Sequence, residues 1–247
     1  MSRLGSALTS PHVITVAAYK GGVGKTTLAL ELAYLLNAVL VDLDWDLGGA
    51  TRAWGYRYET RKGSLLLDAL EKGRVPAPLT GGAHKADLVP SHPELADAVS
   101  DGDALASTLE KWAREWDRPI VVDTHPGGTT TTFGALSASS LALVPTVLAT
   151  KELDALEGLL IELRDYPLML APNKVPGSPP RAELERLTAL ATRYGVPVAP
   201  PVNEYRWLPR RRIRVAVTST DPQPARTAAF TEQLRAVTIA VSTRVDS

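Results

Sequence analysis

Short runs of apolar residues alternate with longer amphipathic segments along the chain. Continuous apolar runs are typical of strands that are buried on both faces of a parallel sheet. We predict strands at residues 12–19, 38–44, 86–91, 119–125, 141–148, 167–175 and 196–202. We predict helices at residues 25–37, 63–72, 103–116, 153–165, 180–194 and 227–243. This alternation indicates an α/β fold, a doubly wound and mainly parallel sheet with helices on both faces.

Length and composition favour one domain that spans residues 1–247, with a flexible N-terminus at residues 1–11. The Gly/Pro-rich pieces at 75–84 and 175–180 are too short to be domain linkers. The chain has no signal sequence and no run of about 18 apolar residues, so we expect a cytoplasmic protein. It also has no cysteine, which excludes disulfides, thiolate metal sites and iron–sulfur clusters.

The stretch "AAYKGGVGKTTLAL" at residues 17–30 nearly matches the phosphate-binding pattern G-x-x-x-x-G-K-[ST]. Gly24, Lys25 and Thr26 fit its end, but Tyr19 stands at the first glycine and Lys20 follows it. A predicted strand enters this loop and a predicted helix leaves it, which phosphate binding requires and which a glycine turn with chance lysines does not explain. The loop residues that we predict to bind a nucleotide are Gly21, Gly22, Val23, Gly24, Lys25, Thr26 and Thr27. Lys25 is expected at the β- and γ-phosphates, Thr26 at Mg²⁺ and Thr27 at the α-phosphate.

The motif "KGGVGKTT" resembles the deviant Walker loop of the ParA/MinD group of ATPases. The segments "GSLLLDALEKG", "ADLVPSHPELADA" and "PNKV" also resemble that group, in the same order, and the resemblance weakens after Pro201. It implies ATP and Mg²⁺ as cofactors and a homodimer that forms on ATP binding. It also implies that Lys20 reaches the phosphates of the partner subunit while Lys25 acts within its own.

Acidic residues follow two of the predicted strands. "VLVDLDWD" places Asp42 and Asp44 on the same side of a strand end, where buried carboxylates are costly unless cations or donors meet them. By the resemblance, Asp44 orients the attacking water, Asp42 supports a water on Mg²⁺, and Asp123 in "PIVVDTHPGG" holds Mg²⁺ through a water. Asp46 is open to an alternative role as a cap. For His125 we favour a structural role over a metal site.

The segment "APNKV" closes a predicted strand, and the resemblance makes Asn173 a candidate to contact adenine. Pro201 and Val202 would then line the base from the next loop. The alternative for Asn173 is a loop residue that satisfies backbone groups.

Charge is distributed unevenly, although Lys+Arg and Asp+Glu both number 27. Residues 201–247 contain eight arginines and four acids, so this part carries +4 and the preceding 200 residues carry −4. The arginines that cluster in "RWLPRRRIRVAV" are Arg206, Arg210, Arg211, Arg212 and Arg214. A solvated loop is the ordinary interpretation of such a run, but with the family resemblance we favour contacts to non-specific DNA.

The resulting hypothesis is a DNA partition ATPase, nucleoid-associated, whose ATP dimer binds DNA and is released when a ParB-like partner stimulates hydrolysis. The alternative is a MinD-like ATPase that acts at a membrane. It is not favoured, because Phe230, Leu234, Val237 and Val241 on the last helix form an ordinary core-packing stripe. A small-molecule ligase on the same fold, such as a biotin-pathway synthetase, is a third class; it would need no lysine acting in trans.

Overall fold

The structure is a computed structural model that describes residues 8, 11–46, 49–60, 63–212 and 214–247. Of the predicted flexible segment 1–11, all but residues 8 and 11 lie outside the described residues. The strands are β1 (Val13–Val16), β2 (Val39–Leu43), β3 (Asp87–Val89), β4 (Ile120–Thr124), β5 (Leu141–Thr146) and β6 (Leu168–Pro172). They form one sheet in the order β3-β2-β4-β1-β5-β6, and every strand pair is parallel. The predicted fold class is confirmed.

The α-helices are α1 (Lys25–Leu35), α2 (Ala50–Trp54), α3 (Leu65–Glu71), α4 (Leu95–Ala98), α5 (Gly102–Trp116), α6 (Thr130–Ser137), α7 (Thr150–Glu162), α8 (Arg181–Tyr194) and α9 (Ala225–Val245). All six predicted helices are present, with ends that differ by a few residues. The short helices α2, α4 and α6 were not predicted. α6 is rich in Thr, a poor helix former, and its Thr129 cap and close packing of Gly134 on Gly102 compensate for this.

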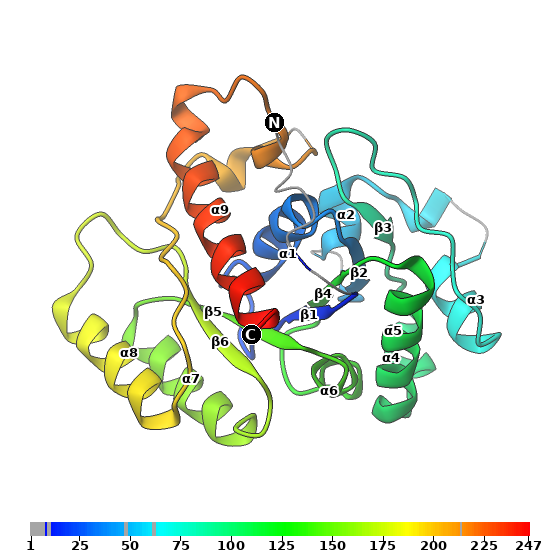
Figure 1. The fold of residues 1–247 in the computed structure, drawn as a ribbon, viewed down its shortest axis with the longest axis horizontal. Helices are drawn as coiled ribbons and strands as arrows, with labels where there is room; N and C mark the ends of the chain where they lie inside the picture. The colour runs from blue at the N-terminus through cyan, green and yellow to red at the C-terminus, as the bar shows by residue number, and fades with distance from the viewer. Residues whose placement is uncertain (1–7, 9–10, 47–48, 61–62, 213) are drawn as a thin grey trace.

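Helices cover both faces of the sheet, as Figure 1 shows. α1 and α9 pack on one face, where Ile14 and Val16 of β1 point. On the opposite face, α3, α5 and α6 cover the half around β2 and β4, and α7 and α8 cover the half around β5 and β6. The apolar stripe of α9, predicted to pack in the core, is buried there, and this prediction is confirmed. A loop follows the carboxyl end of the central strand β1. Ligands bind at this edge in this class of sheet.

The predicted strand at 196–202 is wrong as a sheet strand. The segment lies beside β6, with Ala199 N donating to Leu170 O and Val202 N donating to Pro172 O, both at 2.8 Å. It forms only isolated bridges. Pro197, Pro200 and Pro201 have no N–H to donate, which prevents a continuous ladder.

A buried carboxylate, Glu31 of α1, holds the segment that precedes α9. It accepts hydrogen bonds from the backbone N–H groups of Val217 and Thr218 at 2.6 and 3.0 Å, and from the Thr218 hydroxyl at 2.8 Å. Burial raises the pKa of Glu31, although these donors and the charge of Arg211 oppose the shift. Glu31 therefore connects the phosphate-loop helix to the arginine-rich region.

We expect Glu31→Gln to remove a pH-dependent loss of stability. Because the folded-state pKa lies above the usual value of 4.5, folding loses stability as pH rises from that value through the raised pKa. The variant is less stable at low pH, since the amide cannot accept from all three donors. The stability gap between wild type and variant should narrow as pH rises above about 4.5 in urea unfolding curves. A constant gap, like the one expected for the exposed control Glu115→Gln, would contradict the assignment.

Candidate functional site

The loop between β1 and α1 is built around glycines, and no side chain caps the helix that follows it. Gly22 and Gly24 have φ angles of 80° and 99°, in the left-handed region that favours glycine. Gly24 is the N-cap of α1 and provides no side-chain hydrogen bond, and the first turn carries no acid. Around Gly21 and Gly22 a Cβ atom would meet nothing within 4 Å. The open loop and the helix N-terminus together suit an anion.

Two residues that follow β6 hold this loop. The Asn173 side-chain amide donates to Val23 O at 2.8 Å, and the Lys174 ammonium donates to Gly22 O. A Cβ on Gly24 would collide with the same Asn173 amide, so glycine is required there. Asn173 thus supports the loop backbone, the alternative weighed for it, and its contact with adenine stays a prediction. Lys174 was missed, because its sequence position alone does not show that it reaches back to the loop.

The two predicted base-lining residues differ in exposure. Val202 is buried in the core, whereas Pro201 is exposed. In this conformation only Pro201 is available to a base, and the role of both stays a prediction.

The two loop lysines point to different surroundings. Lys25 is buried, and burial lowers its pKa against the opposing charges of Asp123 and Asp44. The Lys20 side chain is 42% exposed, donates to Lys151 O at 2.9 Å and lies 3.9 Å from a Glu152 carboxylate oxygen. Lys25 therefore faces the buried carboxylates that follow β2 and β4, whereas Lys20 lies beside α7.

Asp42 of β2 and Asp123 of β4 are register partners on adjacent strands, and both are fully buried. Asp42 accepts from the backbone N–H groups of Asp44 and Thr51 at 3.0 and 2.5 Å. Burial, with a contribution from Asp44, nevertheless raises the pKa of Asp42 to about 7. Neither oxygen of Asp123 has a hydrogen-bond partner among the described residues. Burial and the charge of Asp42 raise its pKa well above the usual range.

These oxygens fit a hard cation. The Thr26 hydroxyl lies toward the Asp123 carboxylate and opposes the rise of its pKa. Carboxylate and hydroxyl oxygens are the ligands that Mg²⁺ prefers. Asp44 is also buried, and burial raises its pKa against the opposing effects of the Asp46 N–H, His125 and Lys25. The orphaned Asp123 carboxylate makes Asp42, Asp123 and Thr26 suitable to hold Mg²⁺, directly or through water.

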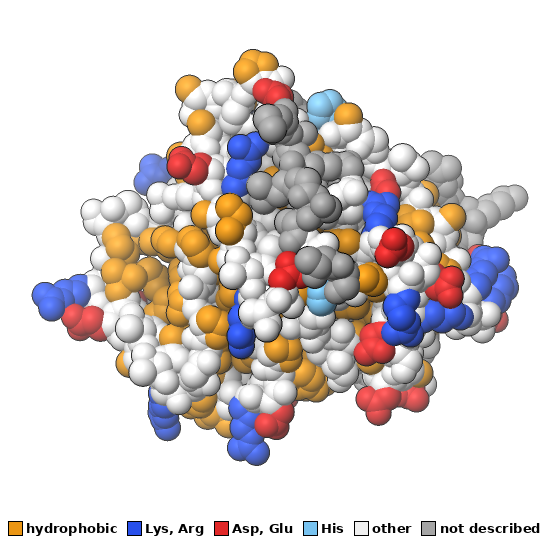
Figure 2. Space-filling model, viewed as in Figure 1, with side chains coloured by type: hydrophobic (Ala, Val, Ile, Leu, Met, Phe, Trp, Pro, Cys, Tyr) orange, Lys and Arg blue, Asp and Glu red, His pale blue; other side chains and the backbone are white. Residues whose placement is uncertain are grey.

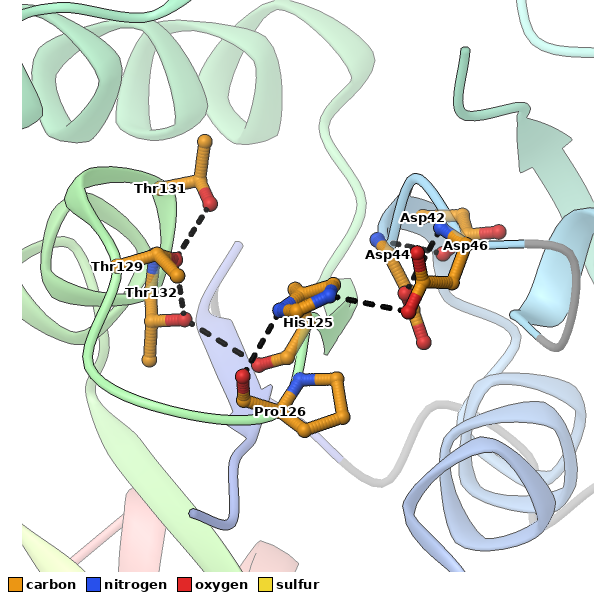
Figure 3. Close-up of polar contacts among 8 residues, drawn as sticks. All are labelled: Asp42, Asp44, Asp46, His125, Pro126, Thr129, Thr131 and Thr132. Carbon is orange, nitrogen blue, oxygen red and sulfur yellow. Dashed lines mark hydrogen bonds and ion pairs between the residues drawn. The ribbon is translucent and has the colours of Figure 1, made fainter. Parts of the chain in front are cut away.

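His125 lies beside the aspartates that follow β2, as Figure 3 shows. His125 Nε2 lies 3.2 Å from an Asp46 carboxylate oxygen, and Nδ1 lies 2.8 Å from Pro126 O. Trp45 stacks on the imidazole with ring centroids 4.0 Å apart and planes 3° apart. Both ring nitrogens are engaged, in keeping with the structural role favoured for His125, although ligand atoms of Asp44, Asp46 and His125 also lie within 4.8 Å of one another. The capping role considered for Asp46 is not seen at α2, because Gly49 is its N-cap and no side chain caps it.

The predicted DNA-binding arginines do not share one environment. Arg206, Arg210, Arg212 and Arg214 are exposed, whereas Arg211 is half-buried and donates to Val215 O at 2.6 Å. Burial lowers the pKa of Arg211 while the charge of Glu31 opposes the shift. Arg211 is thus turned toward its own chain.

The parallel sheet and the glycine-rich phosphate loop together define a P-loop NTPase. Residues 11–166 match the family described as AAA domain, which is more than half of the chain. The chromosome-partitioning ATPase Soj of Thermus thermophilus is 33% identical over 169 residues, covering 65% of this chain and 64% of Soj. The chromosome partitioning protein ParA of Myxococcus xanthus is 32% identical over 168 residues, covering 61% of this chain and 56% of that protein. The chain thus spans less than two thirds of the length of these curated relatives.

Solved structures of low sequence identity share the fold. Apo McdA of Cyanothece has a TM-score of 0.74 at 18% identity, covering 90% of this chain and 98% of McdA. A plasmid partition protein of Borrelia burgdorferi bound to AMPPNP has a TM-score of 0.71 at 21% identity, covering 94% of this chain and 99% of that protein. MinD of Aquifex aeolicus has a TM-score of 0.67 at 22% identity, covering 91% of this chain and 95% of MinD. The chain belongs to the family described as AAA domain, and its similarity to Soj, ParA and MinD supports a place in the ParA/MinD superfamily.

We expect Asn173→Ala to weaken the binding of ATP and of inorganic tripolyphosphate by the same factor. The lost hydrogen bond to Val23 loosens the phosphate loop, and a net contribution of about 1 kcal/mol corresponds to about fivefold in affinity. Isothermal titration calorimetry with both ligands measures this. A loss confined to ATP would assign Asn173 to the base instead.

Proposed function

We propose that this chain is a DNA partition ATPase, cytoplasmic and nucleoid-associated. In this proposal it dimerises on ATP binding, binds non-specific DNA as a dimer, and leaves DNA when a ParB-like centromere-binding protein stimulates hydrolysis. The relatives named Soj and ParA support this assignment, although the chain spans only part of their length.

The observation that carries the proposal is the opposite placement of the two loop lysines. Lys25 is buried beside carboxylates that would surround a nucleotide, whereas the Lys20 side chain is 42% exposed and lies against α7. An exposed ammonium at a phosphate loop is available to a second copy of the chain. Its contacts with Lys151 O and Glu152 are weak at a solvent-accessible position, so they are readily exchanged for a partner's phosphates.

The loop residues and the buried carboxylates have distinct roles in this proposal. Gly21 to Thr27 bind the phosphates through backbone N–H groups, and the Lys25 ammonium offsets the charge on the β- and γ-phosphates. Asp44 orients the attacking water. Mg²⁺, held by Thr26, Asp42 and Asp123, would supply electrostatic stabilisation of the phosphate oxygens. Lys20 of the partner subunit would add charge as the transition state develops, which makes dimerisation part of catalysis.

DNA binding would depend on local clusters of arginine. On the face seen in Figure 2, described basic and acidic side chains are mixed, so the field of that face does not select a DNA surface. The exposed arginines near residue 210 are a local exception. If about five phosphates are neutralised, affinity should fall a few hundredfold between about 50 and 200 mM salt.

The membrane alternative has a fold neighbour in MinD. The apolar stripe of α9 is buried, which leaves that face unavailable to lipid. Within the described residues, no helix combines the length and apolar character needed to cross a membrane. Flotation of vesicles with ATP–Mg²⁺ distinguishes this alternative from DNA binding.

We expect Lys20→Ala to retain nucleotide binding but to lose ATP-dependent dimers and DNA binding. Light scattering measures the dimer, and fluorescence anisotropy of a random-sequence duplex measures DNA binding with ATP–Mg²⁺, with ADP–Mg²⁺ and without nucleotide. Wild type should bind only with ATP. Lys151→Ala is the matched control, since it removes a neighbouring lysine side chain and keeps the carbonyl that Lys20 contacts.

Normal ATP dimers in Lys20→Ala would contradict the role in trans. Absence of DNA binding by wild type in every nucleotide state would overturn the partition proposal and favour a membrane or protein target.

We expect Asp44→Ala to trap the ATP dimer on DNA. Without the carboxylate that orients water, hydrolysis should fall by about 10² to 10⁴-fold while phosphate binding is kept. Phosphate release and the rate of dissociation from DNA after dilution measure the two effects. Rapid dissociation with wild-type phosphate production would refute the role of Asp44.

A further inference from the structure

A cavity of about 620 Å³ lies between α1, α2, the segment before β3 and the arginine-rich segment. Five cationic side chains from three separate parts of the chain line it: Arg52, Lys85, Arg211, Arg212 and Arg214. Glu31 also lines it, but its carboxylate is buried and already accepts three hydrogen bonds. The cavity is therefore strongly cationic, although the chain as a whole is neutral.

Two of these cations, Lys85 and Arg214, lie close to Gly55. The Lys85 ammonium donates to Trp54 O at 2.9 Å and lies 4.2 Å from the centroid of the Trp54 ring. A Cβ on Gly55 would lie 3.8 Å from this ammonium, 3.7 Å from Arg214 Nη1 and 3.2 Å from Arg214 Cδ. Gly55, with φ of 105°, thus leaves room for both side chains. Burial and the charge of Arg214 lower the pKa of Lys85.

Three of the five cations have no acidic partner among the described residues. No described carboxylate lies within ion-pair distance of Lys85, Arg212 or Arg214, and the residues outside the described ranges include no Asp or Glu. Arg52, by contrast, pairs with Glu59, and Arg211 is turned toward Val215 O and Glu31. Like charges that converge without a counter-ion repel one another, and a bound anion would relieve this repulsion.

We propose that Lys85 and Arg214, with Arg212 at the rim, form a pocket that binds a phosphate group of DNA. The guanidinium forks and the ammonium match phosphate oxygens, and the Trp54 ring holds the Lys85 ammonium in place. This inference rests on the proposed function. It adds Lys85, from a segment more than a hundred residues before the arginines, to the DNA surface, and it removes Arg211 from it. A soluble phosphate compound has the same chemistry and is separated from DNA by the second experiment below.

The first experiment measures duplex DNA binding by anisotropy under ATP–Mg²⁺. Lys85→Gln and Arg214→Gln should each weaken binding about tenfold, and each should reduce the slope of log K against log salt by up to about 0.9. Because both cations contact the same phosphate, the double variant should lose less than the product of the two single losses. Lys85→Arg should retain most of the affinity.

Two controls separate this effect from loss of fold or nucleotide. Lys111→Gln removes an exposed lysine on α5 and should bind DNA like wild type. Thr27 also lines the cavity, so the ATP affinity of every variant is measured, and it should be unchanged. Wild-type DNA affinity in both glutamine variants, or an equal loss of ATP affinity, would overturn the pocket.

The second experiment titrates inorganic phosphate into the ADP–Mg²⁺-loaded chain by calorimetry. If wild type binds no DNA in any nucleotide state, the proposed function fails, and this titration alone decides the pocket. Phosphate binding that both glutamine variants lose would support a pocket for a soluble phosphate compound. If wild type binds neither DNA nor phosphate, the proposed phosphate pocket is overturned.

Discussion

The site depends on the burial of two carboxylates that face each other across parallel strands. Register places Asp42 of β2 beside Asp123 of β4, and both side chains are removed from water. Such a pair is tolerated only with protons, donors or cations. Asp42 receives backbone donors, but Asp123 receives none. Positive charge beside this carboxylate pair is therefore stabilising, and the phosphate loop and Lys25 lie at this place.

In the proposed function, this need for positive charge links catalysis to assembly. Lys25 supplies one positive charge from inside, at a position where burial already lowers its pKa. A bound nucleotide brings further negative charge, which a second cation can offset. Lys20 is close in sequence but only half-buried, and the proposed function assigns its charge to the phosphates of another copy. In the proposed function, the same electrostatic requirement drives nucleotide binding, dimer formation and hydrolysis.

Glu31 extends this connection to the arginine-rich segment. Its carboxylate lies on α1, the helix that begins at the phosphate loop, and it holds the backbone at residues 217–218. The cationic cavity lies beside the same helix and also includes Thr27. A phosphate ligand in this cavity would therefore lie beside the helix that begins at the phosphate loop.

The sequence by itself determined the α/β class, six of the strands, the longer helices and the phosphate loop, because these follow from short-range patterns of apolar residues and glycines. It failed at 196–202, where prolines override apolar content, and at α6, where packing overrides weak propensity. Only the tertiary structure brought Asn173 to Val23, 150 residues away, and turned Arg211 from its neighbours toward Glu31. The direction of a side chain and its distant partner depend on how the layers pack, which local spacing does not encode.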